Sequence, residues 1–372
     1  MHIKELIKKI DIWLIILMTL LTGIGVLAIN SATAYNGDNQ NVKKQIIFFL
    51  VGLVLMIVVM SIDYHVLSNW YWVIYISMII MLIAVKLFGV NVNGATRWIN
   101  IAGQQIQPSE FTKIGMILCG ATIINKYNSK INKLWPILII GAFEFIPFIL
   151  VNRQPNLSTS IVLLVILVIQ LFMSKLDMRY ILTGASVSVL LIVVVFVYIV
   201  NNPDQKLIKD YQRKRIMSLV NGGDSSGDKY QTQRAVQAIG SGGLHGKGLN
   251  QGSISQLNYL PESHNDFIMA VLGEEFGFVG ILGIISIILL FIFRGIWIAR
   301  GAPDDLGRFI VIGYFGMIAM QSFVNMGVVT DFLPNTGIPI PFISYGGSSL
   351  WANMMGLGLV LNVAMQSERK MF

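Results

Sequence analysis

The sequence predicts an all-α membrane protein with about ten transmembrane helices. Hydrophobic residues make up 55% of its 372 residues and charged residues only 12%, and the mean hydropathy is +0.69. Soluble domains carry about 25% charged residues, so a water-soluble core does not account for this composition, whereas a bilayer does. Apolar runs of membrane-spanning length recur from end to end, which indicates one integral membrane domain over residues 1–372 rather than two soluble domains.

Ten apolar segments define the predicted helices. The first follows a charged start, but its apolar run is long for a signal peptide and no convincing cleavage site ends it, so we interpret it as a membrane helix. The fourth and sixth are short for a bilayer and are expected to rely on neighbouring helices or a local thin spot. The predicted spans are 10–29, 45–62, 70–87, 109–124, 134–151, 158–173, 180–200, 266–293, 309–328 and 344–364.

The short loops predict the orientation, because Lys and Arg are enriched in cytoplasmic loops. One set of helix ends carries many basic residues, whereas the opposite short loops carry only Lys43, Lys44, Arg97 and Arg153. Both termini are therefore expected in the cytoplasm. The net charge of +8 fits contact with anionic lipid headgroups, and the scattering of basic residues at helix ends argues against nucleic acid binding.

Three polar segments, 89–108, 201–265 and 330–343, are then predicted on the outer face. Part of the long loop, 204–219, has helical apolar spacing and is expected to lie on the membrane surface. The glycines of 240–248 lack the flanking elements of a nucleotide loop and are expected to shape an external groove. The prolines of 330–343 predict irregular backbone, as a plug or as the wall of a substrate groove.

Several acidic residues lie where burial is costly. Glu110 and Lys113 share a helix face. They form either a structural ion pair in a helix that Ser109 caps or the charged wall of a water-filled cavity. Asp266 opens a predicted helix, so it either complements the helix dipole or serves as a general base. Glu274 and Glu275 are expected to be structural, holding their helix against a neighbour. The single cysteine, Cys119, excludes an internal disulfide and zinc binding by cysteines.

Motifs spread over nearly the whole chain make a more specific signal together than any one of them alone. They are INSAT at the end of the first span, GATRWINIAGQQIQPSEFTKI (94–114), QPNLSTS (154–160), GLHGKGLNQGSISQLNYLPESHNDFIMAVLGEEFG (243–277) and LPNTGIPIPFISYGGSSLWANM (333–354). In this order, between correctly placed membrane spans, they resemble the SEDS family, the shape, elongation, division and sporulation proteins of bacterial walls. The pattern of the fourth motif is more similar to the rod-elongation branch than to the division branch.

The resemblance implies a peptidoglycan glycosyltransferase with the SEDS fold and a long extracellular loop between its seventh and eighth helices. Such an enzyme joins lipid II units into glycan strands on the outer membrane face and releases undecaprenyl diphosphate. The implied partners are a class B penicillin-binding protein and other membrane proteins of the elongation or division machinery. A lipid II flippase and a non-catalytic scaffold of these complexes are the alternatives.

The resemblance also implies roles for individual residues. Asp266 matches the family's required acid and would act as general base toward the acceptor sugar, while Glu110 and Lys113 match its catalytic cavity pair. Trp98 would contact sugar, and Arg97, Lys113 and Lys247 would bind the diphosphate. The motifs further imply substrate contacts by Gln107, Ser109, Gln154, Asn156, His264, Pro339, Ser344 and Ser348.

Two departures from the family pattern bear on the mechanism. Asn156 stands where the family commonly has an aspartate, and Asn265 stands where it commonly has a threonine. An asparagine cannot act as a base, so a mechanism that needs a second carboxylate at position 156 is disfavoured. No metal-ligand set is visible in the sequence, and a divalent cation, Mg²⁺ or Mn²⁺, stays an open alternative.

Overall fold

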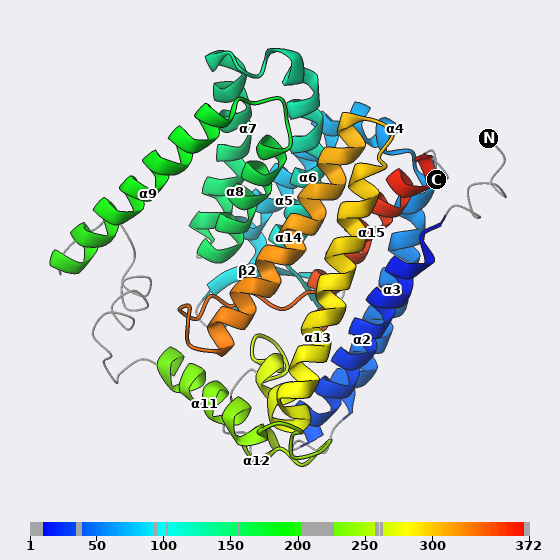
Figure 1. Ribbon diagram of the computed structural model, residues 1–372, viewed down its shortest axis with the longest axis vertical. Helices are drawn as coiled ribbons and strands as arrows, with labels where there is room; N and C mark the ends of the chain where they lie inside the picture. The colour runs from blue at the N-terminus through cyan, green and yellow to red at the C-terminus, as the bar shows by residue number, and fades with distance from the viewer. Residues whose placement is uncertain are drawn as a thin grey trace.

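The protein is a bundle of long helices with a small sheet near one end (Figure 1). The structure, a computed structural model, describes residues 10–34, 39–92, 95–101, 103–154, 156–202, 227–256, 260 and 263–367. Its elements are α2 (Ile12–Thr33), α3 (Gln40–Ser61), α4 (Tyr64–Asn69), α5 (Tyr71–Phe88), β1 (Gly89–Val92), β2 (Ala95–Ile101), β3 (Gln104–Ile106), α6 (Pro108–Tyr127), η2 (Asn128–Lys130), α7 (Leu134–Arg153), α8 (Leu157–Phe172), α9 (Met178–Asn201), α11 (Gly227–Gly242), α12 (Ser253–Gln256), α13 (Ile268–Arg300), α14 (Asp305–Val329) and α15 (Gly347–Gln366).

All ten predicted helices are present at the expected places, as α2, α3, α5, α6, α7, α8, α9, α13, α14 and α15. Within the described residues, seven of them are long and apolar enough to cross a bilayer, and α8 is a shorter apolar helix. The fourth predicted helix is longer than expected, because α6 runs to Tyr127 and has 20 residues. The mostly helical, multi-pass membrane architecture is confirmed.

Composition explains which helices lie at the centre of the bundle. In α15, 83% of the most apolar window is buried and its mean hydropathy is only 1.3, whereas in α3 the corresponding values are 22% and 2.4. A helix that contacts protein on most sides tolerates glycine, serine and asparagine, while a helix facing lipid must be apolar. The inner helix α15 packs on α3, α6 and α14, and these contacts surround the functional cavity.

The segment between α5 and α6, for which no strand was predicted from the sequence, forms a three-stranded antiparallel sheet of order β1-β2-β3. We call the end of the bundle that carries this sheet the sheet end and the other the α4 end. The long 201–265 segment also departs from a simple loop, because it contains α11 and α12 beside α13 (Figure 1). The surface helix predicted over 204–219 falls outside the described residues.

Helix α13 is broken at Gly277, whose φ of 66° lies outside the helical region. The glycine-rich loop after α11 fills this break. The amides of Phe278 and Val279 donate to the carbonyls of Gly243 and Leu244, at 2.9 and 3.1 Å. A broken helix survives at membrane depth only when its freed backbone groups find partners, and this loop supplies them. The predicted groove-shaping role of the glycines is therefore replaced by a packing role.

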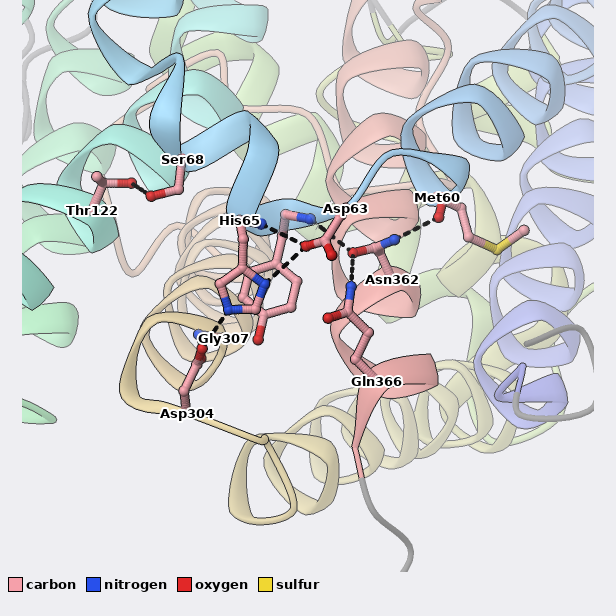
Figure 2. Close-up of polar contacts among 10 residues, drawn as sticks. Met60, Asp63, His65, Ser68, Thr122, Asp304, Gly307, Asn362 and Gln366 are labelled. Carbon is pink, nitrogen blue, oxygen red and sulfur yellow. Dashed lines mark hydrogen bonds and ion pairs between the residues drawn. The ribbon is translucent and has the colours of Figure 1, made fainter. Parts of the chain in front are cut away.

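The α4 end is held by a polar network that links two helix connections and the end of α15 (Figure 2). The ring of His65 lies between two carboxylates, with Nδ1 2.9 Å from Asp63 and Nε2 2.7 Å from Asp304. Asp304 also caps α14 by accepting from the amide of Gly307 at 2.7 Å. The α3–α5 connection is therefore tied to the α13–α14 turn through a single imidazole.

We expect the stabilisation from His65 to depend on pH. Partial burial opposes the charged ring, but the hydrogen bonds that the ring donates to Asp304 and Asp63 outweigh burial and raise the pKa of His65 above 6.5. A raised pKa gives stability that is complete below pH 6.5 and is lost as the pH rises through the raised value. His65→Ala should therefore lower the thermal stability in detergent at pH 6 by less than about 1 kcal/mol, since the groups are partly exposed. A difference from wild type that stays constant up to pH 9 would contradict this origin.

Candidate functional site

A cavity of about 740 Å³ opens among the described residues at the sheet end. It lies between the sheet, the starts of α6, α8 and α15, the inner face of α14 and the 335–339 segment. Of the residues predicted from sequence, it brings together Arg97, Trp98, Gln107, Glu110, Lys113, Asn156, Asp266, Pro339 and Ser348. Residues from four separate sequence motifs thus share one polar cavity.

Glu110 and Lys113 form a buried ion pair on the cavity wall. Pro108 starts α6, where a proline needs no hydrogen-bonded amide, and this places Glu110 in the first turn and Lys113 one turn later. The Lys113 ammonium lies 2.8 Å from Glu110 Oε2, and the two residues are only 1% and 4% exposed. The pair is thus a buried ion pair, and it also lines the cavity.

A small hydrogen-bonded cluster lies beside this pair. Ser109 Oγ accepts from the side-chain amides of Gln107 and Asn156, at 3.1 and 3.3 Å. The prediction that Ser109 caps α6 is wrong, because the capping position is Gln107 and Ser109 lies inside the first turn. Asn156 Oδ1 caps α8 by accepting from the amide of Thr159 at 3.3 Å. Asparagine thus keeps the capping function of an aspartate at position 156 while adding a donor toward Ser109.

Asp266 reaches the cavity from the turn before α13. The helix begins at Ile268 with Phe267 as its N-cap, so Asp266 lies outside the helix and the predicted start at Asp266 is two residues early. Phe267 is only 1% exposed and anchors this turn in the core. Asp266 itself is partly exposed and lines the cavity. A carboxylate on a buried anchor, facing a polar cavity, suits proton transfer to a bound molecule.

The sheet supplies the opposite wall through an irregularity in β2. Val90 pairs with Trp98 and Asn91 pairs with Thr96, so Arg97 is an extra residue without a pairing partner in the ladder. Such a bulge turns side chains that would otherwise alternate between the two faces. Arg97 and Trp98 can therefore both line the cavity, although they are neighbours in a strand. Together with Lys44, Arg97 places positive charge around a cavity that also holds Asp266.

The 330–343 segment is a cavity wall, one of the two predicted forms. Gly337 and Pro339 line the cavity, and Gly337 has a φ of 67°, a conformation that glycine adopts without strain. Ser348, at the start of α15, accepts from the amide of Gln107 at 3.0 Å and so ties this wall to α6. Ser344 is not among the lining residues, because its hydroxyl accepts from the amide of Ile340 at 3.0 Å and closes a turn.

Lys247, Gln154 and His264 also do not line the cavity. Lys247 Nζ is 2.7 Å from Oε1 of Glu274, a fully buried carboxylate that also accepts from the amide of Ile254 at 2.9 Å. Gln154 donates to the carbonyl of Leu82 at 2.9 Å. The ring of His264 packs edge-on against Tyr345, which does line the cavity. The structure thus gives Lys247 an anchoring position rather than a diphosphate-binding one.

The structural role expected of Glu274 and Glu275 is confirmed. Glu275 accepts hydrogen bonds from the hydroxyl of Ser31 on α2 and from the amide of Asn250. Glu274 and Glu275 therefore fasten the 244–254 loop and α2 to the N-terminal part of α13. Both carboxylates are buried, so each needs these donors to remain in the bundle.

We expect Lys247→Met to lower the stability of the protein rather than its affinity for ligand. The substitution leaves Glu274 buried with its two neutral donors but without its cation, which should cost about 1–3 kcal/mol. A thermal-unfolding scan in detergent measures the effect, and Glu274→Gln/Lys247→Met should recover part of the loss. An unchanged melting temperature for Lys247→Met would contradict the anchoring role.

Comparison with known proteins identifies the family of this chain. A family model described as "Cell cycle protein", the group of FtsW, RodA and SpoVE, matches residues 10–369. The chain belongs to this family. It is 38% identical over 360 residues to the peptidoglycan glycosyltransferase MrdB of Escherichia coli K12, covering 95% of this chain and 93% of MrdB. It is 35% identical to the stage V sporulation protein E of Bacillus subtilis, covering 96% and 98%.

Solved structures of the cell cycle protein family share the fold. RodA of Thermus thermophilus matches with a TM-score of 0.71 and 25% identity, over 97% of this chain and 98% of that one. A chain of a peptidoglycan synthase complex, studied for how it coordinates polymerization and crosslinking, matches with a TM-score of 0.81 and 27% identity, over 95% and 97%. The likeness in fold therefore extends over nearly the whole chain.

Some cavity residues were missed from the sequence. Gln321 lies on α14 and is 1% exposed, and within the described part of the chain neither its Oε1 nor the buried hydroxyl of Thr336 has a hydrogen-bond partner. A polar residue within an apolar span signals function by default, and this rule would have selected Gln321. The position of Thr336 depends on the chain path after α14, for which the sequence holds no comparable signal.

Proposed function

We propose that this protein polymerises lipid II into glycan strands as a peptidoglycan glycosyltransferase. The observation that carries the proposal is the meeting of Asp266, the Glu110–Lys113 pair and the bulged Arg97–Trp98 strand in one cavity. This set offers a base, cationic donors and an aromatic face, which are the groups that sugar transfer from a diphosphate requires. Relatives named as peptidoglycan glycosyltransferases support the assignment.

In the proposed reaction, Asp266 accepts the proton of the acceptor sugar hydroxyl as its oxygen bonds to the anomeric carbon of the donor. The bond between that carbon and the diphosphate oxygen breaks, and its electron pair leaves with undecaprenyl diphosphate. Lys44, Arg97 and Lys113 lie where positive charge would stabilise this leaving group. An ammonium has three donors, so Lys113 can hold Glu110 and still donate to a phosphate oxygen.

The steps above use side chains of this protein, and a divalent cation, Mg²⁺ or Mn²⁺, stays an open alternative. Among the described residues, no three His, Cys, Asp or Glu side chains gather to hold a metal ion. The two carboxylates of the cavity are Asp266 and Glu110, and Glu110 is engaged by Lys113. Addition of Mg²⁺ or Mn²⁺ against a chelator in the assay below tests the open alternative.

The charge distribution supports an outward-facing cavity. The α4 end carries Lys126, Lys130, Lys133, Lys175, Arg179, Arg294, Arg300 and Arg308, whereas the sheet end carries few basic residues in short connections. By the positive-inside rule, the α4 end and both termini would face the cytoplasm. The cavity would then open on the outer face of the inner membrane.

We further propose a class B penicillin-binding protein as partner. The support is the fold shared with a chain of a peptidoglycan synthase complex, in which crosslinking accompanies polymerization. Other membrane proteins of the elongation or division machinery would join this pair. The partner and the cell-biological setting are read out by copurification from the native membrane.

Reconstitution with fluorescent lipid II tests the proposed function. The purified protein with its partner should produce glycan ladders that persist in moenomycin, and the partner alone should not. A parallel assay with lipid II enclosed in vesicles separates the flippase alternative, in which lipid crosses the bilayer and no ladder forms. Absence of both ladders and translocation, with an intact complex, would favour the scaffold alternative and refute the enzyme.

A further inference from the structure

One buried side chain on α14 joins two cavity segments that are far apart in the sequence. Asn325 is 1% exposed, and its Nδ2 donates to the main-chain carbonyls of Asp266 and Ile338, at 2.8 Å each. The first carbonyl belongs to the turn before α13 and the second to the cavity wall after α14. Both amide hydrogens are therefore used to hold two separate stretches of backbone on one rigid helix.

The two stretches meet at the carboxylate of Asp266. Gly337, next to Ile338, passes so close that a methyl group added to it would lie 3.5 Å from Asp266 Oδ2. A change in the spacing of the two backbones would therefore move this carboxylate relative to the cavity wall. Among the described residues, the side chain of Asn325 bridges the two carbonyls and so fixes this spacing.

We propose that Asn325 is a positioning residue for Asp266, setting where its carboxylate points in the cavity. This proposal rests on the proposed function, in which Asp266 is the general base. Asparagine suits the task because a single NH₂ group offers two donors from one atom. An apolar side chain of the same size would remove both hydrogen bonds and free the two segments to separate.

The test compares Asn325→Leu with a matched control in the lipid II ladder assay. Asn325→Leu should lower kcat by about 100-fold, because small misplacement of a reacting group costs about that much, while KM changes less than about threefold. The acid limb of the kcat–pH profile should also shift, since the surroundings of the Asp266 carboxylate change. If Asn325→Leu does not fold, Asn325→Asp keeps the shape, exchanges the donors for acceptors and should show the same loss of kcat.

The control is Asn362→Leu at the α4 end (Figure 2). Asn362 is also buried and also fastens backbone, donating to Met60 at 2.7 Å and accepting from the amide of Tyr64 at 3.0 Å. The Asn362→Leu variant should be less stable than wild type, but its kcat per folded molecule and its kcat–pH profile should match wild type. An equal loss of kcat in Asn362→Leu, or wild-type kcat in both Asn325 variants, would overturn the positioning role.

Asp266→Asn in the same assay separates the two levels of the argument. If wild type makes no glycan, the proposed function fails. If wild type polymerises, Asp266→Asn is inactive and the Asn325 variants are normal, only the positioning role fails. If Asp266→Asn polymerises normally, the base assignment fails and the positioning role fails with it.

Discussion

Asp266→Asn is expected to abolish glycan polymerisation while leaving the protein folded and bound to its partner. An amide cannot accept the proton of the sugar hydroxyl, and loss of a general base lowers rates by about 10²–10⁴-fold. The residue lies outside α13 on the cavity surface, and its side chain is partly exposed, so the isosteric change should cost little stability. Ladder formation from fluorescent lipid II measures the rate, and the melting temperature measures the fold.

Asp331→Asn provides the matched control for this substitution. Asp331 also lies at the sheet end, just after α14, but it is not a cavity-lining residue. Its φ of 59° is one that asparagine adopts as readily as aspartate, so the backbone should not respond. The Asp331→Asn variant should polymerise lipid II at the wild-type rate. Equal activity of Asp266→Asn and Asp331→Asn would refute the base assignment.

The largest effect on stability is expected from separating Glu110 and Lys113. Lys113→Met leaves the Glu110 carboxylate buried without its cation, and breaking such a pair typically costs about 3–5 kcal/mol. Glu110→Gln/Lys113→Met removes both charges and should restore most of the lost melting temperature. The double variant should still fail to make glycan, because the cavity loses a donor toward the leaving group.

The control for this pair is Arg308→Met. Arg308 and Asp305 have the same three-residue spacing at the start of a helix and lie 3.2 Å apart, but the two side chains are 39% and 34% exposed. A solvated pair contributes less than about 1 kcal/mol, so its loss should barely change the melting temperature. If Lys113→Met is no worse than Arg308→Met, burial does not make the Glu110–Lys113 pair important. Ladders from the double variant would show that Lys113 is structural only.

The long helices could be predicted from the sequence because apolar length and backbone hydrogen bonding leave few alternatives in a bilayer. The sheet was missed, although an Asn93-Gly94 pair between short apolar runs is a recognised hairpin signal. Mean hydropathy over a membrane-length window does not detect such short strands between membrane spans. The gathering of Glu110 and Asp266 in one cavity followed from motif resemblance, and hydropathy alone would not have joined them.

The error on Lys247 has a different cause. A lysine in a polar loop near a proposed diphosphate site is indistinguishable, in sequence, from one that pairs with a buried glutamate 27 residues away. The role of Asn325 could not be predicted from the sequence either, because its two acceptors are backbone carbonyls, which every residue type has. Residue chemistry predicts which side chains can act, whereas only the packing shows which of them are already occupied.

The break in α13 bears on how the chain enters the membrane during synthesis. The loop that fills the break precedes α13, so the ribosome makes Gly243–Gly248 before it makes Gly277. The contacts between them are made by main-chain groups, with Lys247 and Gly248 donating to the carbonyls of Glu274 and Glu275 at 3.0 Å. The loop 243–248 is thus already translated when the broken helix leaves the translocon. Insertion order, and not only the final packing, favours closing the break with the segment that comes first.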